Sequence, residues 1–265
     1  MGLSGYTASA MRLLSAIAYY TLLEAWRARL LLLLAAALAL LLALGFFMSQ
    51  LAIIDSARVQ VNVYAAGARL AAVFLLCTHV LGSISREFSD KGIDVLLALD
   101  VPRAHYILGK LAGFAALAVL AAAVVWLPLA AQAPWPALLQ WGAALALELT
   151  LMAAFALFCA TAFGQFVPAA ALVLAFYLLA RSLGAIQQIS AHPVSGAGTA
   201  AHDAGRWLVD ILALVMPALD RSPQTAWLID VAAPWPSFAA WLAQAVAYVV
   251  VLAGAAMVDF QRRNF

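Results

Sequence analysis

Two ionisable side chains interrupt apolar stretches of this 265-residue sequence. Glu148 lies within ALALELTLMAAF, and His79 lies within LLCTHVLGS. A charged group at the centre of a bilayer costs about 2.5–3.5 kcal/mol on insertion scales, so such groups often mark a transport path. Glu148 can line a cavity or pair with a basic group, or it can stay protonated and hydrogen-bond to a neighbouring helix. His79 can contact a transported molecule or simply pack. Both are candidate residues of a cargo path.

The sequence has no residue pattern typical of an enzyme. Gly-x-Ser-x-Gly, His-Glu-x-x-His and paired aspartates within the apolar stretches are absent. Gly109-Lys110 does not end a phosphate-binding loop, because that motif needs glycine at position 104 and serine or threonine at 111, where this chain has Ala104 and Leu111. His192 and His202 lack the spacing of metal ligands. We therefore expect no enzyme activity, no bound cofactor and no metal site on this chain.

The longest charged passage is SREFSDKGIDVLLALDVPRAHYILGKL, residues 85–111. Its first polar residues follow one another at helical spacing and share one face of a helix, while apolar residues fill another face: Glu87, Asp90, Lys91 and Asp94. We predict a short amphipathic helix from Glu87 to Leu99. Pro102 should end it, because the residue before a proline avoids the helical conformation. A second helix should start near Arg103.

The composition indicates a membrane protein. Hydrophobic residues make up 67% of the chain and charged residues 10%, against about 25% charged in soluble domains. The apolar stretches are too long and too continuous for the alternating strands of a barrel, so the predicted fold is all-α and polytopic, in one domain covering residues 1–265. The scattered basic residues give no stripe for nucleic acid. We predict six transmembrane helices, near residues 30–48, 67–84, 109–131, 138–163, 166–186 and 239–259.

The arrangement of Lys and Arg residues predicts the orientation, since cytoplasmic loops are enriched in them. Both termini and the loop at 86–107 should be cytoplasmic, and a long loop at 187–238 should face outside. Residues 11–29 predict an amphipathic interfacial helix before the first span, and residues 206–220 predict a helix at the outer interface. Arg69 and Arg181 lie near predicted span ends, so we expect their side chains to reach water.

The charged passage resembles the cytoplasmic loop of six-span type V permeases of ATP-binding-cassette exporters. The tail MVDFQRRNF is similar to the Phe-x-Arg-Arg ending that those permeases often have. The sequence departs from the pattern in two places. Ile93-Asp94 follows Gly92 where members usually have Thr-Leu-Glu, and Asp100 stands where they have proline. These departures leave the subfamily and the cargo open. The matching residues are Glu87, Gly92, Leu96-Leu97, Pro102-Arg103 and Gly109-Lys110.

The resemblance implies a division of labour between two kinds of subunit. A separate ATPase subunit would bind ATP and Mg, and the helix between the second and third spans would dock on it as a coupling helix. A second permease copy would complete the path, mainly through the first, second and fifth spans, in the cell inner membrane. An ion-driven carrier or a channel without an ATPase is the alternative. The implied docking residues are Glu87, Phe88, Lys91, Gly92, Asp94, Leu97 and Arg103.

Overall fold

The computed structural model describes residues 3–52, 55–89, 103–191, 200–221, 223–229 and 234–262. Helices and turns make up this part of the chain, and it contains no strand. Six helices are long and apolar enough to cross a bilayer, which confirms the all-α prediction and makes this a multi-pass membrane protein. They are α2 (Leu30–Leu51), α3 (Ser56–Ser89), α5 (Arg103–Trp126, continued by the 3-10 turn η1, Leu127–Ala131), α6 (Trp135–Phe163), α7 (Phe166–Ala191) and α10 (Trp235–Arg262).

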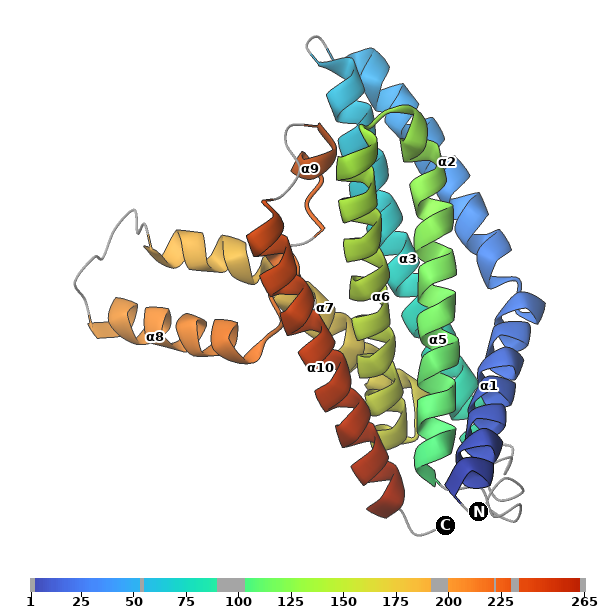
Figure 1. The fold of residues 1–265 in the computed structure, drawn as a ribbon. Coiled ribbons are helices and arrows are strands. Elements are labelled where there is room, and N and C mark those ends of the chain that lie inside the picture. Colours follow the sequence, from blue (N-terminus) through green and yellow to red (C-terminus); the bar gives the residue numbers. More distant parts are fainter. Residues whose placement is uncertain are drawn as a thin grey trace.

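The core of the bundle is α6, which packs against α3, α5, α7 and α10 (Figure 1). Small residues such as Ala144 and Ala153 are fully buried on it and allow the neighbouring helices to approach closely. By contrast, α2 exposes large apolar side chains such as Leu40 and Phe46. A lipid-facing surface is as apolar as a core, so this distribution is typical of a membrane bundle.

The turn between α6 and α7 lies where the sequence predicts it. Gly164 adopts a left-handed conformation with φ 66°, and its N–H donates to the Ala160 carbonyl at 3.0 Å. This conformation favours glycine because a Cβ would be strained there. The chain therefore reverses at once, and the two apolar stretches form separate helices. The predicted helix start near Arg103 is also confirmed, by the first residue of α5.

The amino-terminal helix α1 (Leu3–Arg27) is longer than the predicted 11–29 segment and ends just before Arg29, which has φ 55°. It packs along α5 and runs beside the lower half of the bundle, where the last turns of α10 also lie (Figure 1). The helix itself is confirmed. Its predicted interfacial position is not, since α1 lies against a spanning helix along much of its length.

Two helices form an arm beside the bundle. α8 (Ala200–Val215) folds back along α7, and the pair extends to the left in Figure 1. The predicted 206–220 helix thus begins and ends about five residues earlier, and it is followed by the 3-10 turn η2 (Leu219–Arg221) and the short helix α9 (Ala226–Ile229). α8 exposes Trp207 and Leu214, as an amphipathic helix against lipid would.

Candidate functional site

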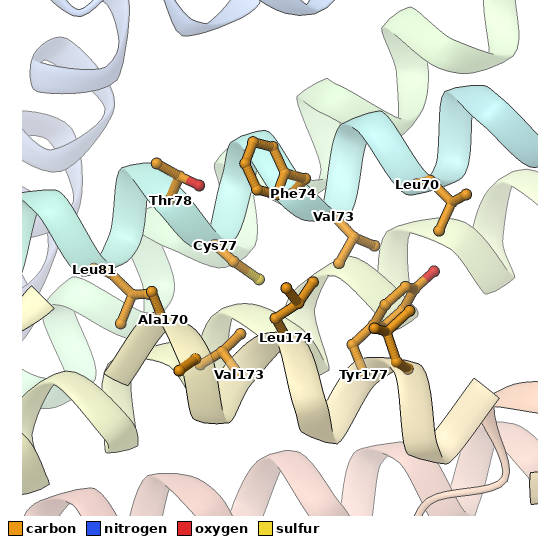
Figure 2. Close-up of a pocket in the computed structure, with 12 residues that line it drawn as sticks. Leu70, Val73, Phe74, Cys77, Thr78, Leu81, Ala170, Val173, Leu174 and Tyr177 are labelled. Carbon is orange, nitrogen blue, oxygen red and sulfur yellow. The ribbon is translucent and has the colours of Figure 1, made fainter. Parts of the chain in front are cut away.

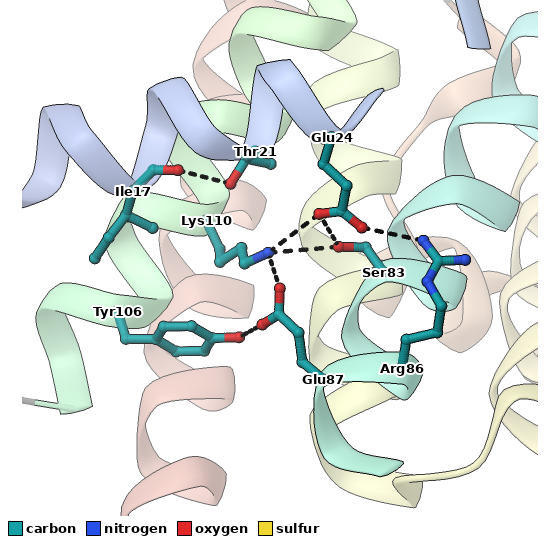
Figure 3. Close-up of polar contacts among 8 residues, drawn as sticks. All are labelled: Ile17, Thr21, Glu24, Ser83, Arg86, Glu87, Tyr106 and Lys110. Carbon is teal, nitrogen blue, oxygen red and sulfur yellow. Dashed lines mark hydrogen bonds and ion pairs between the residues drawn. The ribbon is translucent and has the colours of Figure 1, made fainter. Parts of the chain in front are cut away.

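Lys110 on α5 is the central residue of a polar cluster that joins α1, α3 and α5 (Figure 3). Its side chain is only 7% exposed, yet it forms ion pairs with two carboxylates. Its Nζ lies 3.6 Å from Glu24 Oε2 on α1 and also pairs with Glu87 on α3. It lies 3.4 Å from the Ser83 hydroxyl as well. We call Lys110 with Glu24, Ser83, Arg86, Glu87 and Tyr106 the lysine cluster.

Both carboxylates of the lysine cluster have further donors. The Tyr106 hydroxyl donates to Glu87. The Ser83 hydroxyl donates to Glu24 at 2.8 Å, and Arg86 Nη2 donates to it at 3.0 Å. Burial alone would raise the pKa of the Glu24 carboxyl, but the charge of Lys110 and these hydrogen bonds outweigh it, so the pKa is lowered. The cluster is a balanced set of two cations and two anions.

Two glycines on α5 allow α1 to approach the lysine cluster. A Cβ at Gly109 would lie 2.8 Å from the Ile17 Cβ, and one at Gly113 would lie 2.6 Å from the Thr21 Cβ. Thr21 is buried there and satisfies its own hydroxyl by donating to the Ile17 carbonyl at 2.8 Å. This Gly-x-x-x-Gly spacing is a common device for close helix contact in membranes. It brings Glu24 within reach of Lys110.

The described part of the predicted docking surface is already engaged within the chain. Glu87 belongs to the lysine cluster, and Phe88 packs edge-on against Phe260 at 6.5 Å between ring centroids. Arg103 Nη1 donates to the Gln261 carbonyl at 3.1 Å, near the end of α10. Docking by these three residues stays a prediction. The other four predicted docking residues lie outside the described residues: Lys91, Gly92, Asp94 and Leu97.

Glu148 on α6 is fully buried, and neither of its oxygens accepts a hydrogen bond from the described residues. Arg69 and Arg181 both act on its charge. The expectation that Arg69 reaches water is wrong, because it is 7% exposed and donates to the Pro223 carbonyl at 2.6 Å. Arg181 is partly exposed, so the expectation stays a prediction for it. Arg181 Nη2 donates to the same carbonyl at 3.2 Å. The chain itself supplies acceptors that water would otherwise provide.

His79 and Glu148 have different neighbouring residues. It packs edge-on against Phe114 at 6.4 Å between ring centroids. The charged groups that act on it are Glu24, Arg86 and Lys110, which belong to the lysine cluster. The structure therefore does not bring the two predicted cargo-path residues into one site.

A groove of about 370 Å³ lies between α3 and α7 (Figure 2). Its volume is within the range of small-molecule sites. The walls are apolar, with Val73 and Leu174 pointing toward one another, and Tyr177 adds a hydroxyl near one end. No group of three or more metal-ligating side chains occurs in the described ranges. The α3–α7 groove is suited to an apolar occupant.

A scan against protein-family models finds no match, and a search of curated proteins finds none either.

Sequence reasoning missed the role of Lys110. It noted Gly109-Lys110 as part of a motif, but burial of that lysine depends on partners from α1 and α3. One local signal was present: Tyr106 and Lys110 are four residues apart and so share a helix face. The Gly109 to Gly113 spacing was a second signal, for a helix packed against that face.

Proposed function

We propose that this chain is the membrane-spanning subunit of an ATP-driven exporter of the ATP-binding-cassette class. A separate ATPase subunit would supply ATP hydrolysis and hold ATP and Mg. The observation that supports this most is the lysine cluster, which joins the two ends of the charged passage that resembles the loop of a coupling helix. Glu87 is the first residue of the predicted coupling helix and Lys110 lies after it, and the two form a partly buried ion pair.

We call residues 90–102, which contain most of the predicted coupling helix, the coupling segment. It would transmit force because the residues on both sides of it are fixed. At one end Glu87 is bound to Lys110, and at the other Arg103 is bound to the last turn of α10. Movement of residues 90–102 by a closing ATPase would therefore act on α3, α5 and α10 together. Lys110 would extend the effect to α1 through Glu24. Such a bundle could change between two states only if its contacts differ between them.

The α3–α7 groove is the proposed place where two copies meet around the cargo path. It lies between the second and fifth spans, and its rim residues Phe74 and Leu174 are exposed in the single chain. In this arrangement the termini and the coupling segment face the cytoplasm, on the side rich in Lys and Arg. The site of action is the inner membrane of the cell.

Co-purification with an ATPase tests the proposal. The chain is tagged, solubilised gently, and compared with the charge-reversal variants Asp94→Lys and Lys91→Glu. We expect an ATPase subunit to purify with the wild-type chain and to be lost from the variants. Glu87 is left intact, because a lysine at 87 would put a second cation beside Lys110. A folded wild-type chain that purifies with no ATPase from its own cells contradicts the proposal.

An ion-driven carrier is the second candidate function. The buried Glu148 favours it, since carboxylates within spanning helices often take part in proton relays in carriers. Transport by reconstituted vesicles separates the two candidates. Dependence on ATP with the ATPase present supports the exporter, whereas dependence on an imposed ion gradient alone supports the carrier.

A further inference from the structure

Arg69 on α3 and Arg181 on α7 hold one segment of the chain that follows α8. Arg69 Nη1 and Arg181 Nη2 both donate to the Pro223 carbonyl, at 2.6 and 3.2 Å. Arg181 Nη1 also donates to the Leu219 carbonyl. Leu219 and Pro223 are themselves buried. Two guanidinium groups therefore fix this segment to the bundle.

Glu148, on α6, is a buried acid on whose charge both arginines act. Its carboxylate is completely buried and accepts no hydrogen bond from the described residues, although Arg69 and Arg181 are close enough to act on it. The Tyr177 hydroxyl on α7 acts on it as a hydrogen-bond donor would, but the two groups do not meet hydrogen-bond geometry in this position. An unpaired buried carboxylate is unfavourable. A bound cation would be a poor remedy, because both neighbouring guanidinium groups would repel it.

Two acids act on the charge of Arg181. Besides Glu148 on α6, Asp220 in η2 attracts its guanidinium. Gly184, one turn further along α7, leaves room for Asp220, because a Cβ at that position would collide with the Asp220 carboxylate. The held segment thus offers two carbonyls and one carboxylate to the arginines, and α6 offers a second carboxylate.

We propose that Arg69 and Arg181 form a two-position latch. In the position seen here they bind the carbonyls of Leu219 and Pro223, and Glu148 lacks a hydrogen-bond donor. In the second position the guanidinium groups pair with Glu148, and the segment that contains Leu219 and Pro223 is released from the bundle. In the first position Glu148 is without the guanidinium donors, and in the second position the carbonyls of Leu219 and Pro223 are without them. Such an exchange gives two discrete states rather than a gradual deformation. The latch does not depend on ATP or on the exporter proposal.

Cysteine labelling at Leu219 tests the latch. The variant Leu219→Cys keeps the backbone carbonyl and places a thiol at a position that is fully buried while the latch is closed. In a Cys77→Ala, Cys159→Ala background, a membrane-impermeant maleimide should reach this thiol only when the segment is released. The labelling rate of purified protein therefore reports the population of the released state.

The proposal predicts opposite effects from two substitutions. Glu148→Gln removes the charge that attracts the arginines, so labelling should slow about tenfold. Arg181→Gln removes donors to Leu219 and Pro223, so labelling should accelerate about tenfold. Asp55→Asn alters an exposed acid outside both the latch and the lysine cluster and should leave the rate unchanged.

Faster or unchanged labelling in the Glu148→Gln variant overturns the latch, because a carboxylate that only supports packing would loosen the segment when altered. A lack of labelling in every variant, including Arg181→Gln, also overturns it, since no released state would then exist. If Leu219→Cys does not fold, hydrogen exchange of the backbone amides after Leu219 gives the same comparison. Protection there should rise in Glu148→Gln and fall in Arg181→Gln of an otherwise unaltered chain.

Discussion

Lys110 and Glu87 form an ion pair that spans 23 residues of sequence and joins α5 to α3. The ammonium group is nearly excluded from water, whereas Glu87 and Glu24 keep side-chain exposures of 29% and 31%. The lysine therefore bears most of the desolvation cost, and it depends on both acids. If either acid were lost, one buried cation would be left with a single partner.

Removing the central cation should destabilise the bundle strongly. Lys110→Met leaves Glu24 and Glu87 close together without it, which we expect to cost about 2–4 kcal/mol. Arg86→Met is the matched control: its side chain is 61% exposed, so loss of its 3.0 Å pair with Glu24 should cost less than about 1 kcal/mol. Thermal unfolding of the purified variants in one detergent measures both. Equal losses in the two variants would contradict a central role for Lys110.

Acidification should weaken the lysine cluster through Glu24. Its pKa is lowered in the folded chain, so its contribution to stability is present above the pKa of an unfolded glutamate, about 4.3, and is lost as the pH falls through the lower folded value. Below about pH 4.5 the unfolding temperature of the wild type should therefore fall more steeply than that of Glu24→Gln. Asp55→Asn alters a side chain that is 67% exposed and should show the wild-type slope. Parallel curves for wild type and Glu24→Gln would refute the assignment.

The contact between α1 and α5 should not tolerate a methyl group at Gly113. Its Cβ would lie 2.6 Å from the Thr21 Cβ and 3.0 Å from the Ala18 carbonyl oxygen, so the helices must separate. We expect Gly113→Ala to cost about 1–3 kcal/mol. Gly254→Ala on α10 meets nothing within 4 Å and should gain up to about 1 kcal/mol from helix propensity. Unfolding temperatures that shift in the same direction would show that α1 does not pack as described.

Hydropathy was enough to predict the six spanning helices, because an apolar stretch of about 20 residues specifies a span without reference to the rest of the chain. The α6–α7 break was equally local, since it depends on Gly164. The ends of the helices were less predictable. α3 begins at Ser56, eleven residues before the predicted start of the span, because its first turns are helical but too polar to belong to the apolar stretch.

The polar contacts were not predictable in the same way. Arg69 was expected to reach water, because it lies near the end of an apolar stretch. Its acceptor is the Pro223 carbonyl, 154 residues later, and no periodicity in the sequence relates the two. Glu148 was recognised as unusual from its own neighbours, but the arginines that face it come from two other helices. Local patterns therefore identify buried charges and leave their partners to the tertiary fold.

The proposed pairing of two copies along the α3–α7 groove predicts a specific crosslink. Leu174 lies on the rim of this groove, whereas Leu139 lines a different groove between α5 and α6, and both side chains are well exposed in the single chain. In a background without Cys77 and Cys159, Leu174→Cys should form a disulfide-linked dimer in native membranes under mild oxidation. Leu139→Cys should stay monomeric, because its groove would face lipid in the pair. Crosslinking of both variants to the same extent would indicate random collision, and crosslinking of Leu139→Cys alone would place the second copy at the groove between α5 and α6.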